Sequence, residues 1–195
     1  MPLKSLAEYE LLAAQAHGHL CAGQILGLRM ALHGVKLLGL DDPAGKDRKR
    51  LVSFVEIDRC MTDAIGVVTG CRLGKRALKF RDFGKAAATF CDLQENRAVR
   101  IAARESSKER ARALYPEISD KNQQQMHAYR EMPDDELFTV EWVRVTIGAE
   151  DLPGYKAPRV VCAQCGEGVN FRREVTQDGR TLCRACAGER YYDHA

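Results

Sequence analysis

The chain has no apolar segment long enough to cross a membrane. Hydrophobic residues make up 45% of its 195 residues, but no window approaches the roughly 18 consecutive apolar residues that a spanning helix needs. The first fifteen residues carry Glu8 and Glu10 among apolar side chains, so they lack the uninterrupted apolar centre of a signal peptide. These absences predict a soluble, cytoplasmic protein that does not associate with a membrane.

The sequence also has no large excess of positive or negative charge. Thirty Lys and Arg side chains face 27 Asp and Glu side chains, for a formal net charge of +3, which does not by itself indicate a nucleic-acid partner. The sequence further lacks a glycine-rich nucleotide-binding loop and the G-x-S-x-G turn of a serine hydrolase. Neither nucleotide-dependent chemistry nor serine-hydrolase chemistry is therefore indicated.

Cysteine, in contrast, is frequent. Eight cysteines in a reducing compartment are not expected to form structural disulfides. Four are scattered through the first half of the chain and four are tightly spaced near its C-terminus, and only the second group has the spacing of a metal site. The scattered group is Cys21, Cys60, Cys71 and Cys91, and the spaced group is Cys162, Cys165, Cys183 and Cys186.

Hydrophobic periodicity predicts an α+β core domain over residues 1–150, in which helices pack on an antiparallel or mixed sheet. The expected helices cover residues 5–16, 23–39 and 61–70 and two charged segments on either side of Pro116. The expected strands cover residues 51–57, 77–83, 86–92, 97–103 and 138–147. Residues 151–158, which contain two prolines and a glycine, form the expected linker to a small zinc-ribbon-like finger over residues 159–195.

Two local patterns add detail to the first two helices. Ser5 followed by Glu8 is the pattern of a capping box at the start of a helix. Gly23, Gly27 and Ala31 recur at four-residue spacing on one face of the second helix. We therefore expect another backbone, from a helix or a sheet, to approach that face closely.

The four C-terminal cysteines predict a zinc site. Two C-x-x-C pairs are separated by 17 residues, and zinc prefers four soft ligands in a tetrahedron. Gly166 follows the first pair, where the turn favours positive φ, and Asp178–Gly179 is expected at the turn of a hairpin between the pairs. A segment of about 35 residues buries too little apolar surface to fold alone, so zinc would stabilise it. Two redox dithiols are the less favoured alternative.

The finger is not strongly basic. Residues 154–195 hold seven Lys or Arg and five Asp or Glu, and four thiolates with one Zn²⁺ bring this segment close to neutral. Phe171, Tyr191 and Tyr192 are suited either to stacking on bases or to packing within a small ribbon. The balance of charge favours a structural or protein-contact finger and makes a nucleic-acid partner the weaker hypothesis.

A second candidate site begins at three alternating residues, His17, His19 and Cys21. They lie in the joint between the first two predicted helices, where an extended backbone would turn all three side chains to one side. Cys21 would then lie at a helix N-terminus, which favours the thiolate form that binds metals.

A similar pattern follows the first strand. Asp58 is expected to cap the next helix, and Cys60 and Asp63 share a face of that helix at i, i+3 spacing. If the two joints met, imidazole, thiolate and carboxylate groups would surround one point, which suits zinc or another borderline metal. The alternative is that Cys60 is a small core residue. Cys91 is expected to pack in the core, and Cys71 is undecided.

The segment HGHLCAGQILGLRMA resembles the H-G-H-x-C-P-G opening of the FmdE family, the E-subunit family of formylmethanofuran dehydrogenase. EIDRCMTDAIGVVTGCRLGK, RDFGKAAATF and RAVRIAAR resemble later blocks of that family in the same order. The resemblance implies an α+β core, often in an intertwined homodimer, with a metal site around the His/Cys motif. Ala22 stands where the family usually has proline, which fixes the angle at which a helix begins.

Carried over by position, the resemblance places His17, His19 and Cys21 in the first motif of the family. The second motif falls on Asp58, Cys60, Asp63 and Cys71. Cys21, Cys60 and His19 are preferred as ligands, because at least one histidine should instead orient another ligand. The expected core metal is zinc, with Asp58, Asp63 and Cys71 in supporting positions.

The favoured function is a metal-binding accessory protein associated with molybdenum or tungsten oxidoreductases, with a finger that contacts protein. One alternative is a metal-dependent enzyme in which Asp58 or Asp63 acts as general base beside an open coordination position. Another is a metal- or redox-responsive regulator that acts through the finger.

Overall fold

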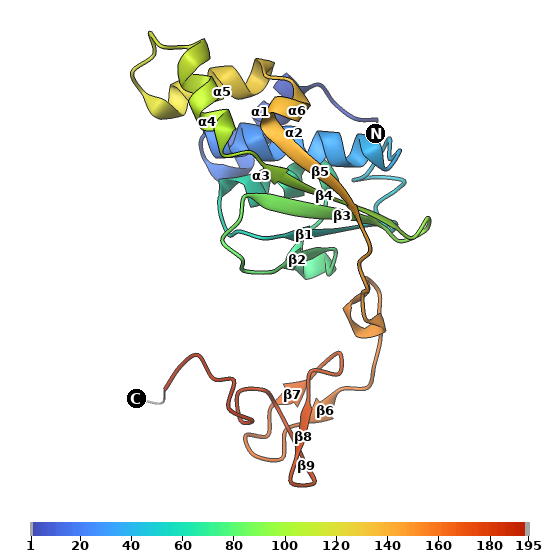
Figure 1. Ribbon diagram of the computed structural model, residues 1–195. Coiled ribbons are helices and arrows are strands. Elements are labelled where there is room, and N and C mark those ends of the chain that lie inside the picture. The colour runs from blue at the N-terminus through green and yellow to red at the C-terminus, as the bar shows by residue number, and fades with distance from the viewer. Residues whose placement is uncertain (1, 194–195) are drawn as a thin grey trace. The chain divides into compact units, whose positions relative to one another are not determined.

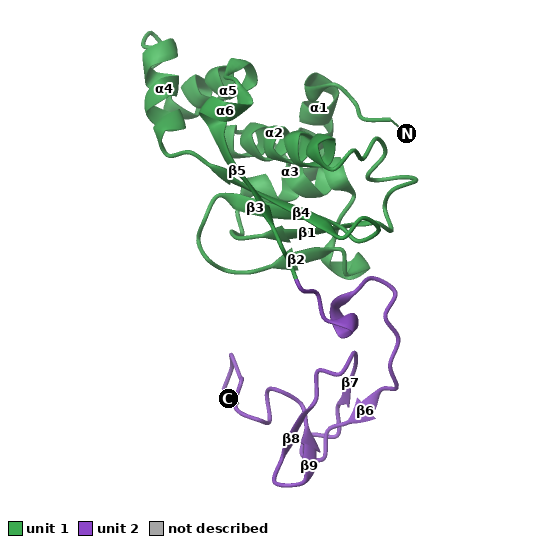
Figure 2. Ribbon diagram, turned by 45° about the vertical axis from the view of Figure 1, so that its right-hand side comes forward, with its two compact units in different colours: residues 1–145 green, residues 146–195 purple. Residues whose placement is uncertain are grey.

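The structure is a computed structural model that describes residues 2–193. The chain divides into two compact units, residues 1–145 and 146–195 (Figure 2). The first unit therefore ends at Val145, five residues before the predicted end of the core domain at residue 150. None of the described helices is both long enough and apolar enough to span a bilayer.

Unit 1 is built around one five-stranded mixed sheet with the strand order β2-β1-β3-β4-β5. Strand β2 runs parallel to β1, and the other neighbours are antiparallel. The α+β class and the mixed sheet are thus confirmed. The strands are β1 Leu51–Val55, β2 Leu78–Phe80, β3 Ala87–Asp92, β4 Arg97–Ala103 and β5 Phe138–Val143.

Helices lie over one face of this sheet (Figure 1). Their order along the chain follows the prediction, with the addition of one short helix before the last strand. The α-helices are α1 Leu6–His17, α2 Ala22–Leu37, α3 Cys60–Thr69, α4 Ser106–Leu114, α5 Lys121–Glu131 and α6 Asp134–Leu137. The 3₁₀ helices are η1 Leu73–Lys75, which belongs to unit 1, and η2 Ala149–Asp151, which belongs to unit 2. Unit 2 holds two short hairpins, β6 Val160–Val161 with β7 Gly168–Val169, and β8 Val175–Gln177 with β9 Arg180–Leu182.

The sequence explains where α1 begins and ends. The Ser5 side chain accepts a hydrogen bond from the Glu8 amide, and the Glu8 carboxylate accepts one from the Ser5 amide, so the predicted capping box is present. Gly18 ends the helix with a φ of 94°, a left-handed conformation that residues with a side chain rarely adopt. The chain therefore turns sharply between His17 and Cys21.

Helix α2 is the centre of unit 1, and its small residues let α3 approach it closely. A Cβ atom on Gly27 would lie 2.5 Å from the Met61 carbonyl oxygen and 2.7 Å from Met61 Cα. On another face, a Cβ on Gly34 would lie 2.3 Å from the Phe90 ring of β3. The predicted close approach is thus confirmed, and the backbone that makes it belongs to α3.

A polar cluster joins α2 to the segment after α5. The Arg29 guanidinium donates hydrogen bonds to the Tyr129 and Met132 carbonyl oxygens and to the Asp134 carboxylate. His33 Nδ1 lies 2.9 Å from the other Asp134 oxygen. Hydrogen bonds from His33 and Arg29 outweigh partial burial and lower the pKa of Asp134 to about 2. The cluster closes the C-terminal end of α5, whose last carbonyl groups have no partner within the helix.

Replacing Gly27 by alanine is expected to destabilise unit 1 by about 1–3 kcal/mol, because the new methyl group must push the α3 backbone away from α2. Urea unfolding followed by the fluorescence of Trp142, the only tryptophan of the chain, measures this change. Gly74→Ala is the matched control, since a Cβ at Gly74 meets no atom within 4 Å. Equal stability of the two variants would show that the helix contact is not tight.

The Asp134→Asn variant is expected to lose stability at neutral pH but not in strong acid. The pKa of Asp134 falls from 3.8 to about 2 on folding, so its stabilising contribution is complete above pH 4 and is lost as pH falls through about 2. Since the side chain is partly exposed, solvent screening reduces the expected effect to about 1 kcal/mol. Urea unfolding at pH 7 and pH 2.5 measures it, and an equal difference at both pH values would contradict the assignment.

Candidate metal centres

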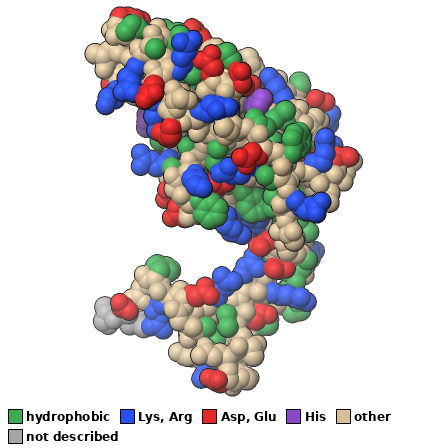
Figure 3. All heavy atoms as spheres, in the orientation of Figure 1, with side chains coloured by type: hydrophobic (Ala, Val, Ile, Leu, Met, Phe, Trp, Pro, Cys, Tyr) green, Lys and Arg blue, Asp and Glu red, His purple; other side chains and the backbone are tan. Residues whose placement is uncertain are grey.

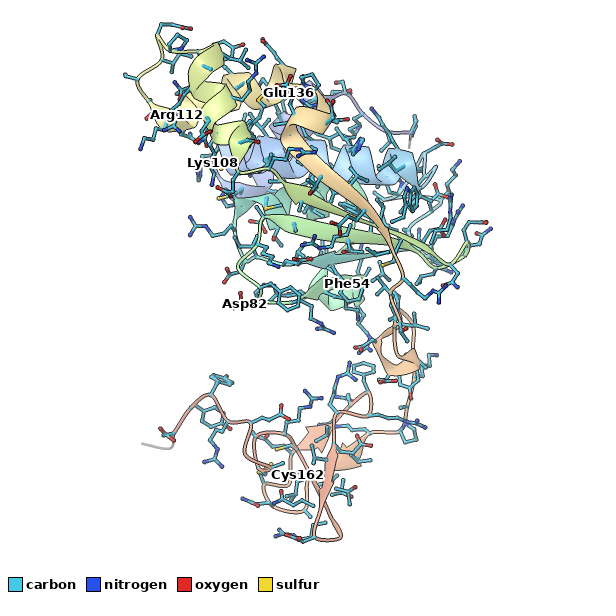
Figure 4. The ribbon with its side chains drawn as sticks, in the orientation of Figure 1. Phe54, Asp82, Lys108, Arg112, Glu136 and Cys162 are labelled. Carbon is cyan, nitrogen blue, oxygen red and sulfur yellow. The ribbon has the colours of Figure 1, made fainter. Side chains whose placement is uncertain are left out.

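The four finger cysteines form a compact group of sulfur atoms. Their Sγ atoms all lie within 4.8 Å of one another, and Figure 4 labels Cys162 within unit 2. The Gly166 amide donates to the Cys162 carbonyl oxygen, and Gly166 has the predicted positive φ of 75°. The Ala187 amide makes the equivalent bond to Cys183. Each C-x-x-C pair therefore lies on a tight turn, as in a zinc knuckle.

Backbone amides also point at the sulfur atoms. The Gln164 amide lies 3.5 Å from Cys162 Sγ, and the Cys186 amide lies 3.4 Å from Cys183 Sγ. Backbone hydrogen bonds lower the pKa of Cys162 to about 6, whereas the hydrogen bond with Cys183, followed by burial, raises the pKa of Cys186 to about 12. A cation among the four sulfur atoms would stabilise their thiolate forms, and the compact geometry of the cluster fits a structural Zn²⁺ ion.

The segment between the two pairs carries the predicted hairpin. Strands β8 and β9 pair antiparallel, and both turn residues have positive φ, 49° for Asp178 and 72° for Gly179. This is the backbone of a type I′ turn, for which Asp-Gly is a favoured pair. The Ala163 amide donates to the Thr181 carbonyl oxygen and ties the first knuckle to the hairpin.

The core motif lies where the sequence predicted it, between α1 and α2. His17 is the last residue of α1, and Cys21 is the N-cap of α2 with an extended backbone. Cys60 is the first residue of α3. A Cβ atom on Gly23 would lie 3.4 Å from Cys60 Cβ and 3.8 Å from Cys21 Sγ. Both cysteines therefore lie against the same glycine, at neighbouring helix N-termini.

The two core thiols affect one another. Burial, together with the hydrogen bond to Cys21, raises the pKa of Cys60. This rise in the pKa of Cys60 opposes the effect of its position at the start of a helix, since helix N-termini favour the thiolate. A cation beside Cys21 and Cys60 would compensate for the burial of a thiolate, so metal binding here is expected to release protons.

One histidine of the motif is held by a carboxylate. His17 Nδ1 lies 2.8 Å from Asp63 Oδ2, and the His17 and His19 ring centroids are 4.9 Å apart. His17, Cys60 and Asp63 line one cavity of about 460 Å³, together with Asp58, Arg59 and Thr62. His17 of the first predicted motif thus lines this cavity with Asp58, Cys60 and Asp63 of the second, whereas His19 and Cys21 are not among its lining residues.

The core donors do not converge as tightly as the finger sulfurs. Within residues 2–193, the finger is the only place where three or more His, Cys, Asp or Glu ligand atoms lie within 4.8 Å of one another. The sequence prediction for Asp58 as a helix cap is wrong, because Arg59 is the N-cap of α3 and no side chain caps it. Asp58 instead lines the cavity beside Cys60.

Two scattered cysteines belong to the protein interior. Cys91 lies in β3 and is 4% exposed, and burial raises the pKa of its thiol to about 12. Cys71 is 2% exposed, and its sulfur lies 3.5 Å from Ser53 Oγ and 3.7 Å from the Leu51 carbonyl oxygen. The Cys71 thiol therefore contacts β1.

Comparison with known families decides what kind of protein carries these two centres. Residues 16–139 match the family described as "FmdE, Molybdenum formylmethanofuran dehydrogenase operon". The chain belongs to the FmdE family. Residues 156–192 of this FmdE protein also match the family described as "Prokaryotic dksA/traR C4-type zinc finger". Both matches agree with the sequence prediction of an FmdE-like core followed by a four-cysteine finger.

Two individual proteins are similar to this FmdE chain. A crystal structure of a tungsten formylmethanofuran dehydrogenase FmdE-like protein from Syntrophus aciditrophicus has the same fold, with a TM-score of 0.66 and 21% identity over 99% of this chain and 100% of that one. A protein of Archaeoglobus fulgidus described as "Probable S-adenosyl-L-methionine-binding protein" is 31% identical over 217 residues. That match covers 97% of this chain but 55% of the relative, so the chain spans about half the relative's length.

Removal of zinc is expected to unfold the finger and to leave the FmdE core folded, because the core has its own apolar interior whereas the finger depends on the metal. Hydrogen exchange on the full chain, with and without a chelator, measures this. Amides of Val175–Gln177 and Arg180–Leu182 should lose protection, while those of Ala87–Asp92 should keep it. Unchanged protection in the finger would contradict a structural role for zinc.

Proposed function

We propose that the core of this FmdE protein binds a second metal ion, most readily zinc, at the N-termini of α2 and α3. The observation that carries the proposal is the pair of cysteines, Cys21 and Cys60, which lie against Gly23. Helix N-termini are favourable places for thiolates, and two thiolates at one place favour a borderline metal such as zinc.

The third ligand in this proposal is His17. Its Nδ1 atom is held by Asp63, which leaves Nε2 for the metal. A histidine that binds metal through one nitrogen commonly donates its other N–H to a carboxylate, which fixes the tautomer and the ring orientation. Asp63 therefore acts as the orienting group. His19 is exposed next to His17 and is the reserve ligand, which reverses the order of preference that the sequence suggested.

A site of two cysteines and one histidine leaves one coordination position for water or another molecule. Cys21 and Cys60 share Gly23 as a neighbour, and in this proposal the His17 ring joins them at the metal ion. The core would then supply a Lewis-acidic ion beside a cavity that contains two carboxylates, Asp58 and Asp63. This arrangement supports either metal handling or metal-dependent chemistry.

Metal content of the full chain tests the proposal. Wild-type protein purified in the presence of zinc is expected to hold two zinc ions per chain, and the Cys21→Ser, Cys60→Ser double variant is expected to hold one. Cys91→Ala is the control, because Cys91 packs inside the sheet, and it should keep two. Equal zinc content in the double variant and the control would contradict the core site.

Variants of the histidine and its partner give a finer test. His17→Ala is expected to remove the core ion, and Asp63→Asn to weaken its binding about 10–100-fold, because loss of a ligand's orienting partner costs that much in metal sites. His127→Ala is the matched control, since His127 is exposed on α5 and contacts the Tyr115 ring. Competition with a chromogenic chelator measures the affinity. An effect of His127→Ala equal to that of His17→Ala would refute the ligand assignment.

For the finger we propose contact with a protein partner. Val161 and Tyr191 are 64% and 95% exposed, and the near-neutral charge of residues 154–195 favours protein over nucleic acid. The description of the FmdE family makes a molybdenum or tungsten oxidoreductase the first partner to test, and a second copy of this chain the next. The alternative is that the protein responds to metal or redox state and regulates a partner through the finger.

The archaeal relative supplies a second candidate function, binding of S-adenosyl-L-methionine. The similarity extends over 97% of this chain, and the core has a cavity large enough for a small ligand beside the proposed metal site. Equilibrium dialysis with the labelled compound tests this candidate independently of metal content. Saturable binding at micromolar concentration would support it, and its absence would remove it.

A further inference from the structure

A second cavity adjoins the one at the proposed metal site. It measures about 240 Å³ and shares Thr62 and Asp63 with the larger cavity that His17 and Cys60 line. The two hollows therefore lie on either side of one short segment of α3. None of the three proposed metal ligands, His17, Cys21 and Cys60, is among the residues that line the smaller cavity.

The smaller cavity is mainly apolar. Val67, Leu73 and Leu78 contribute to its wall, together with Ala16 at the end of α1. Leu73 is 66% exposed at this position, although an exposed leucine side chain gains free energy when apolar surface covers it. The wall thus offers contact area to the apolar part of a ligand.

A positively charged side chain lines the same cavity. Arg72 is exposed and lines the hollow beside Leu73. Its backbone is held firmly, because the amides of Lys75, Ala77 and Leu78 all donate to the Arg72 carbonyl oxygen. A fixed backbone that presents an exposed guanidinium is suited to pairing with a carboxylate or a phosphate.

The charge of the surrounding segment favours the same kind of ligand. Residues 72–85 contain six Lys or Arg and one Asp, a balance of +5. The whole chain carries +3, so the remaining 181 residues sum to −2. Over the face drawn in Figure 3, basic and acidic side chains otherwise lie interspersed. The positive excess of the protein is thus concentrated in the segment that begins at the cavity, and it would attract anions.

We propose that this cavity binds an amphipathic organic anion, with its anionic group on Arg72 and its apolar body against Val67, Leu73 and Leu78. The inference rests on the proposed function only in placing this ligand beside a metal ion. Asp63 lines both cavities and Asp58 lines the metal-side cavity, so these two carboxylates repel an anion from that side. They orient the ligand with its charged end toward Arg72.

Binding of hexanoate to the full-length, zinc-loaded protein tests the proposal. Acetate keeps the charge without the apolar body, and 1-hexanol keeps the apolar body without the charge. Hexanoate is expected to bind at least ten-fold more tightly than either compound and to shift the methyl resonances of Val67 and Leu73. Hexyl phosphate serves as a second probe that shows whether the anionic end prefers phosphate. Binding of hexanoate no tighter than that of 1-hexanol would overturn the proposal.

Variants of the arginine provide the control. Arg72→Gln is expected to weaken hexanoate binding at least ten-fold, and Arg72→Lys to restore part of it. Arg112→Gln removes an exposed arginine on α4, labelled in Figure 4, and should leave binding unchanged. Methyl spectra establish that each variant remains folded. Equal binding by Arg72→Gln and Arg112→Gln would refute the role of Arg72.

The Cys21→Ser, Cys60→Ser variant separates this proposal from the metal site. It should bind hexanoate within about three-fold of the wild type, because neither cysteine contributes to the smaller cavity. If the wild-type protein binds hexanoate through Arg72 but holds only one zinc ion, the core metal site is refuted and the anion site is not. If the protein holds two zinc ions but binds hexanoate independently of Arg72, the anion site is refuted and the core metal site is not.

Discussion

The close contact between α2 and α3 determines the candidate core site. Gly27 lets the α3 backbone approach to a distance that no larger residue permits, and Gly23, one turn earlier on α2, is in ordinary contact distance of the two cysteines. Because both helices begin at this crossing, their N-terminal residues, Cys21 and Cys60, become neighbours. The joint after α1 then needs only to bring His17 to the same edge. A packing requirement of the core thus creates the arrangement of donors.

Much of this fold follows from local sequence patterns. The capping box at Ser5 and the Asp178–Gly179 turn each depend on neighbouring residues, and both are present in the structure. The glycine spacing in α2 also predicted a close backbone contact, although the sequence did not show which element would make it. The C-x-x-C spacing of the finger was equally informative, because two knuckles already supply four converging sulfurs.

The features that the sequence did not predict depend on contacts between segments that are distant in the chain. The proposed choice of His17 over His19 rests on Asp63, which lies 46 positions away in the chain and contacts His17 Nδ1, so the sequence alone did not indicate it. Asp58 lies just before α3 yet does not cap it, because the helix begins after Arg59 in an extended conformation. No sequence motif marks Arg72, since its proposed role depends on a cavity formed by residues of α1, α3, η1 and β2. Side-chain partners and cavities of this kind are tertiary properties.

X-ray absorption at the zinc edge tests the central claim, a second metal ion at Cys21 and Cys60, most directly. A finger site alone has four sulfur ligands at about 2.3 Å, whereas imidazole nitrogen and water bind zinc at about 2.0–2.1 Å. Full-length protein is predicted to hold two zinc ions per chain and to show both distances. One zinc ion per chain with sulfur ligands only would contradict the account.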